Sequence, residues 1–167
     1  MPQATTAGSH SVSHPLDTVE EIISANEWPC DRTSDDELIA EIPGKWGDYR
    51  IHFAWTADMS TLHFSCTIDL KVPRQSRAPV AELLALANER LWLGHFGLSA
   101  DDGQPMFRYA VPLRGAGGVT VEQLEDIVDA AINECERFYP AFQYVVWGGK
   151  SPAEAVTVAC IEPVGEA

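Results

Sequence analysis

The side chains of this sequence that could do chemistry are a few histidines and one arginine. His52 and His63 occur in the stretches YRIHFAWT and TLHFSCTIDL, in which apolar and polar residues alternate. His95 and Arg108 occur further along, on either side of the turn DDGQ. Imidazoles can bind metal ions or transfer protons, and a guanidinium can bind anions. These four residues are therefore the candidates for a small-ligand or catalytic site.

None of these side chains has a complete set of partners in the sequence. A metal site built on His52 and His63 needs a third ligand, and Asp69 lies too far along its strand to supply one. No serine or cysteine nucleophile forms a recognisable motif with His95. The Gly-rich stretch RGAGG matches neither a dinucleotide-binding loop nor a Walker loop. We therefore expect no catalytic residue, no metal and no cofactor, and a protein that is not an enzyme.

The four cysteines, Cys30, Cys66, Cys135 and Cys160, show no pattern of a reactive or metal-binding site. They form no C-x-x-C pair, and no histidine lies at zinc-finger spacing from them. None has a sequence neighbour that would activate a thiolate. We expect reduced and mostly buried thiols that behave as small apolar side chains.

The charge of the chain restricts its partners. It has 25 acidic and 11 basic residues and a net charge of −14. Such a surface repels nucleic-acid phosphates and anionic membranes, and no apolar run reaches the about 18 residues that a membrane span needs. We expect no nucleic-acid and no membrane partner. The acidity permits a basic partner, or it serves solubility alone.

The 167 residues suit one domain with its own core. Residues 1–15 form a polar tail without the basic and apolar regions of a signal peptide, so we expect a disordered tail and a cytoplasmic protein. Residues 16–162 form the domain, and residues 163–167 a frayed C-terminus.

The clearest structural signal is the alternation in residues 49–70, which positions the two histidines. An antiparallel pair around a two-residue turn at Asp58–Met59 gives opposed residues whose numbers sum to 117. One face is then apolar, and the other is polar and carries His52 and His63 on a diagonal. The apolar pairs are Ile51 with Cys66, Phe53 with Phe64, and Trp55 with Leu62.

Other strands and helices surround this hairpin. DELIAEIP predicts a strand, the preceding PCDRTS a short edge strand, and HFGLSA with PMFRYAVPL a hairpin that turns at DDGQ. Helices are predicted at about 17–27 with an Asp17–Glu20 capping box, and at 77–93 between a Ser76 cap and a Gly94 stop. A third helix starts at a Thr120–Gln123 capping box and should kink or break at Pro140, and a fourth starts at Ser151. The order α-β-β-β-α-β-β-α-α indicates an α+β fold with an antiparallel sheet packed against helices.

Several stretches together resemble one family. GKWGDYRIHFAW, LHFSCTIDLKVP, LLALANERLWLGHFGL, PMFRYAVPLRG and ECERFYPAFQYVVWGGKSPAEAV are similar to sequences of the YbjN family, the bacterial sensory transduction regulators. The resemblance covers about residues 16–160. It implies a type III secretion chaperone-like fold, often dimeric, that works by binding protein segments, and it carries over no catalytic residue.

The sequence therefore favours a non-enzymatic chaperone-like or regulatory adaptor, a homodimer with an unidentified protein partner. Phe53, Phe64, Phe107 and Phe138 are expected in the core. Aromatic residues near helix ends are the expected partner or dimer contacts: Trp92, Phe142 and Trp147. The alternative is a small-ligand protein or enzyme that uses His52, His63, His95 or Arg108. A structural dimer without a client is a third possibility.

Overall fold

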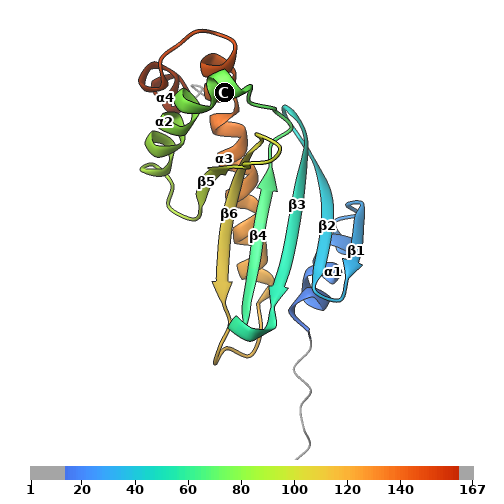
Figure 1. Cartoon of the computed structure of the whole chain (residues 1–167). Helices are drawn as coiled ribbons and strands as arrows, with labels where there is room; N and C mark the ends of the chain where they lie inside the picture. The colour runs from blue at the N-terminus through green and yellow to red at the C-terminus, as the bar shows by residue number, and fades with distance from the viewer. Residues whose placement is uncertain (1–13, 162–167) are drawn as a thin grey trace, which may run out of the picture.

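A computed structural model describes residues 14–161 of the chain (Figure 1). The helices are α1 (Pro15–Ala25), α2 (Arg77–Asn88), α3 (Val121–Val146) and α4 (Pro152–Cys160). The strands are β1 (Cys30–Ser34), β2 (Glu37–Gly44), β3 (Gly47–Thr56), β4 (Thr61–Thr67), β5 (His95–Leu98) and β6 (Pro105–Pro112). Two short 3-10 helices, η1 (Ala57–Met59) and η2 (Arg74–Ser76), precede β4 and α2.

All six strands form one antiparallel sheet in the order β1-β2-β3-β4-β6-β5. The long helix α3 lies behind the sheet in Figure 1, and α1 packs on the same side near β1 and β2. The opposite face, toward the viewer, is not covered by any helix of the described residues. The expected α+β class is confirmed. The edge stretch PCDRTS is a full strand, so four strands rather than three precede α2.

The predicted register of the central hairpin is confirmed. Ile51 pairs with Cys66 and Phe53 with Phe64. The expected two-residue turn is wrong, because the chain leaves the ladder after Thr56 and makes the short helix η1. Ser60 then takes a left-handed backbone with φ 47° and returns the chain to β4. The numbers of paired residues still sum to 117, because the four residues of η1 and Ser60 separate the last pair, Thr56 and Thr61.

The sheet face toward the helices is built from large apolar side chains. All six phenylalanines of the chain belong to one connected group of ring contacts, with centroids 5.0–6.3 Å apart. Phe96 of β5 lies at its centre and contacts rings from β6 and from α3. Edge-to-face pairs of this kind add to the apolar burial. The expectation that Phe53, Phe64, Phe107 and Phe138 are core residues is confirmed.

Helix α3 begins as its sequence predicts. The Thr120 side chain accepts a hydrogen bond from the backbone N–H of Gln123, and the Gln123 side chain accepts one from Thr120 N–H. The predicted break at Pro140 does not occur, because the helix continues to Val146. Proline removes one intrahelical hydrogen bond. Burial of the neighbouring Phe138 and Phe142 against the sheet outweighs that loss.

The other helix ends differ in part from the prediction. Helix α1 begins at Pro15 with His14 as its cap, so Asp17 lies in the first turn. The expected tail 1–15 therefore ends in two ordered residues, and residues 1–13 and 162–167 lie outside the described part. Helix α4 starts as predicted, because Ser151 Oγ accepts a hydrogen bond from Glu154 N–H at 3.3 Å.

Helix α2 is shorter than predicted. It ends at Asn88, whose side chain bonds both the N–H and the C=O of Phe96 in β5, at 2.6 and 3.1 Å. The Ser76 side chain makes no capping hydrogen bond, since η2 runs directly into the helix. Gly94 is not a helix stop but precedes β5 at φ +69°, where an added Cβ would collide with the ring of Phe107.

Candidate functional site

The candidate residues converge on the open face of the sheet. Strand pairing places Ser65 opposite His52 on one side and opposite Arg108 on the other. Arg108 in turn lies opposite His95. Three of the four side chains singled out from the sequence thus share one row that crosses β3, β4, β6 and β5. The fourth, His63, lies in the next row of the same face.

Small side chains hollow this face into a trough. In the row of His63, the flanking positions are Ala54 on β3 and Ala110 on β6. Gly97 on β5 also lacks bulk, so the taller side chains stand around an open space of about 740 Å³. The trough is lined by His52, His63, His95 and Arg108 together with apolar residues that include Met106 and Leu98. The sequence signal for the hollow is a small residue two positions after His52, His95 and Arg108, namely Ala54, Gly97 and Ala110.

The charge of the trough differs from that of the rest of the chain. None of its fourteen lining residues is an aspartate or glutamate. The nearest acidic contact is Glu37 Oε1, which lies outside the lining at 3.5 Å from His52 Nε2. Arg108 is exposed and makes no ion pair with any residue in the described part of the chain. A free guanidinium and three imidazoles make this an acid-free, donor-rich surface.

Two catalytic arrangements, an activated serine and a metal cluster, are not present among residues 14–161. Ser65 and His52 lie directly opposite each other, but no hydrogen bond between their side chains is present within residues 14–161 to activate the hydroxyl. His52 and His63 occupy diagonal positions, as their sequence spacing predicted. Nowhere in residues 14–161 do three potential ligands among His, Cys, Asp and Glu gather to hold a metal ion. What remains is a set of hydrogen-bond donors above an apolar floor.

The three predicted contact residues have different environments. Trp92, between α2 and β5, is 72% exposed, and Trp147, at the end of α3, is 63% exposed. Phe142 is 0% exposed and packs its ring against Phe96 at 5.9 Å. Because Phe142 is part of the core, its side chain cannot reach a partner while the chain is folded. The contact prediction therefore rests on the two tryptophans.

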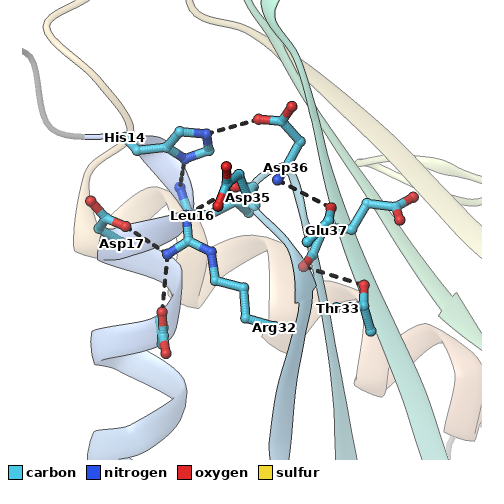
Figure 2. A network of polar contacts seen from close by, with 10 residues as sticks. His14, Leu16, Asp17, Arg32, Thr33, Asp35, Asp36 and Glu37 are labelled. Carbon is cyan, nitrogen blue, oxygen red and sulfur yellow. Dashed lines mark hydrogen bonds and ion pairs between the residues drawn. The ribbon is translucent and has the colours of Figure 1, made fainter.

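A polar network that the sequence analysis missed joins α1 to the edge of the sheet (Figure 2). Arg32 of β1 donates to Asp17 at 2.6 Å and to Glu20 at 3.1 Å, the two residues that were expected to form a capping box. The hydrogen bond from Arg32 lowers the pKa of the Asp17 carboxyl and raises the pKa of Arg32 itself. His14 accepts from Leu16 N–H at Nδ1, so its proton is on Nε2, which faces Asp36 at 3.0 Å.

The cysteines are partly as expected. Cys66 of β4 and Cys135 of α3 are buried and in contact, with their sulfur atoms 3.8 Å apart. The contact with Cys66, together with burial, raises the pKa of the Cys135 thiol well above its usual range. Cys30 is exposed and Cys160 is half-buried, so the expectation of mostly buried thiols holds for two of the four.

The described residues contain no helix long and apolar enough to cross a membrane. No curated protein shows significant similarity to this chain.

Among solved structures, the fold is similar to the crystal structure of YbjN, "a putative transcription regulator from E. coli". The TM-score is 0.52 and the sequence identity 16%, over 83% of this chain and 92% of that one. The ExsC-ExsE complex is a weaker match, with a TM-score of 0.49 and 15% identity over 72% and 86% of the two chains. The first likeness shows a shared fold, and the second carries no conclusion about this chain.

The sequence itself matches one family over most of its length. The match runs over residues 15–144, which includes α1, the whole sheet, α2 and nearly all of α3. The family resemblance expected from the sequence is thereby confirmed. The chain belongs to the YbjN family, described as "Putative bacterial sensory transduction regulator".

Proposed function

We propose that this protein is a non-enzymatic regulatory or chaperone-like adaptor that binds a segment of another protein on the open face of its sheet. The observation that carries the proposal is the trough, a hollow across four strands of a face that no helix of the described residues covers. Its floor and walls combine apolar contact with N–H donors, the mixture that a bound peptide segment requires.

The shape of the trough favours a segment over a buried small molecule. It is open along the sheet, and Met106, Arg108 and His95 stand at its surface. A peptide can lie along such a surface and use its own alternation of side chains. Ligands of drug size are usually enclosed over most of their surface.

Site-specific photocrosslinking in the native cell tests this proposal. A photoreactive amino acid in place of His95, inside the trough, should give one discrete adduct with another protein. The same residue in place of Glu21, exposed on α1, is the matched control and should give none. Ala110→Trp fills the trough at an exposed position and should abolish the adduct. Adducts that form equally from both positions, or that survive Ala110→Trp, would contradict the proposal.

A small-ligand protein is the second candidate function. The convergence of His52, His63, His95 and Arg108 on one hollow favours it, because a small anion could be held by the same donors. A change in the chemical shifts of these residues on adding inorganic phosphate, without any protein adduct, would select this candidate.

Homodimerisation is a separate part of the proposal, and the exposed tryptophans support it. An exposed indole at both Trp92 and Trp147 is typical of an interface residue. Light scattering should give the mass of two chains for the wild type and of one chain for Trp92→Asp or Trp147→Asp, with unchanged circular dichroism. Trp46→Asp is the control, because Trp46 is already stacked on Tyr139 within the chain at 5.4 Å. A wild type with the mass of one chain would reject the dimer, and a dimer without a trough adduct would favour a structural module.

A further inference from the structure

We infer that the partner segment is acidic, and that its carboxylates are held in the trough by Arg108 and the surrounding histidines. This inference rests on the proposed function, since it names the chemistry of the segment that the trough receives. It assigns to Arg108 the role of the main anchoring residue.

The distribution of charge is the first reason. The chain carries 25 acidic residues, yet none lines the trough, whereas three of its five histidines do. On the open face, the acidic strand residues Asp31, Glu37 and Glu41 lie on β1 and β2, and Asp48 lies at the start of β3, outside the lining of the hollow. A donor-rich patch whose own lining holds no carboxylate, in such a chain, is complementary to an anion.

The pairing of Arg108 is the second reason. Arginine side chains on this protein can find carboxylates, as Arg32 does with Asp17 and Glu20 and Arg137 does with Glu134. Arg108 has no such partner among the described residues, because its neighbours across the strands are Ser65 and His95. Arg108, Ser65 and His95 can each donate a hydrogen bond to a carboxylate, and arginine can do so with two parallel N–H groups.

The net charge of −14 repels an acidic partner, whereas Arg108 attracts one, and distance decides which effect is larger at the trough. At physiological salt, charges more than about 8 Å apart in solvent are largely screened. Helix α3, with its acidic residues, lies behind the sheet (Figure 1), whereas Arg108 would touch the bound segment directly. The acidic remainder of the surface then prevents binding of such a segment elsewhere and directs it to the trough.

A second copy of this chain is a poorer occupant of the trough. In a two-fold interface the same patch faces itself, so Arg108 and the three histidines would meet their own copies. The two Arg108 guanidinium groups would then oppose like charge, with no carboxylate of the lining between them. The trough therefore fits a different protein, and any homodimer would use another surface.

The test uses the full chain and two short synthetic peptides, one that alternates Glu with Val and one that alternates Gln with Val. Titration calorimetry should show that the Glu peptide binds about tenfold more tightly, the effect of a close charge pair. Arg108→Glu should remove that preference, and Arg108→Gln should reduce it. Arg74→Glu changes the net charge equally at an exposed site outside the trough, so it should leave the preference intact.

Each other result has a definite meaning. If both peptides bind equally and Ala110→Trp abolishes the binding of both, the trough binds peptide segments, and only the inference that the segment is acidic is overturned. A tighter complex with a Lys–Val peptide would overturn it in the same way. If inorganic phosphate at the peptide concentration displaces the Glu peptide, the trough is a small-anion site. If no peptide binds and the His95 crosslinker gives no adduct, the proposed function itself falls.

Discussion

The two faces of the sheet share one backbone register but carry opposite kinds of side chain. On β6, Phe107 points into the core at 0% exposure, and the next residue, Arg108, lies exposed on the open face. On β3 and β4 the same step separates Phe53 from Ala54 and Phe64 from His63. The helix side is filled by rings, whereas the open side has small residues that leave a hollow.

This difference separates stability from binding. Residues of the helix side are fixed by close packing, so a change of volume there affects the whole fold. Residues of the open side touch solvent, and their identity has little effect on folding. A polar side chain on the open face is therefore a better indicator of function than any residue of the core.

The largest expected effect compares two neighbours on β6. Phe107→Ala removes a ring that contacts both Phe64 and Phe96, and it should lower the free energy of unfolding by about 3–5 kcal/mol. Arg108→Ala, on the opposite face, should change it by no more than about 0.5 kcal/mol. Urea denaturation of both variants measures the contrast. A loss for Arg108→Ala as large as that for Phe107→Ala would show that the open face also stabilises the fold.

A smaller effect is expected at Tyr49, a buried polar residue of β3 on the helix side of the sheet. Tyr49 is 2% exposed, and its hydroxyl has no hydrogen-bond partner within the described residues. Tyr49→Phe removes a buried unsatisfied group and should raise the free energy of unfolding by about 1 kcal/mol.

The same variant has a pH signature. Burial, and then the charge of Glu136, raise the pKa of the Tyr49 phenol above its usual range. Because its pKa is raised, the folded state holds the phenol proton more tightly than the unfolded state does. Titration of Tyr49 therefore leaves the free energy of unfolding unchanged below the unfolded pKa of about 10 and lowers it as pH rises above that value. Stability should therefore fall less steeply in alkali for Tyr49→Phe than for the wild type, as measured by thermal melts. Parallel pH curves would contradict this role for Tyr49.

The smallest effect is expected at the edge strand, where the helix-facing position of β1 carries a charge instead of a ring. Arg32→Gln removes both ion pairs to α1 and should lower the melting temperature slightly at neutral pH. The pKa of Asp17 is lowered in the folded state. The stabilisation that its carboxylate gives the fold is therefore present above the unfolded pKa of about 3.9 and is lost as pH falls below it.

Melting curves from neutral to acid pH measure this effect. The difference between wild type and Arg32→Gln should close below about pH 4. Arg74→Gln, which removes a cation that forms no ion pair among residues 14–161, should show no difference at either pH. A difference that persists in acid would mean that Arg32 acts through its packing.

The sequence by itself determined the features that depend on neighbouring residues. The period of two in residues 49–70 gave the register of β3 with β4, and the capping boxes at Thr120 and Ser151 marked two helix starts. These features are readable because each depends on side chains a few residues apart along the chain.

The tertiary structure alone decided how distant segments meet. Insertion of β6 between β4 and β5 brings Arg108 beside Ser65 and His95 beside Arg108, and so builds the trough. It also decided that Phe142 lies in the core, that Pro140 is tolerated within α3, and that Asp17 bonds Arg32 instead of capping α1. No local pattern encodes such contacts, because their energy comes from the burial and pairing of residues far apart in the chain.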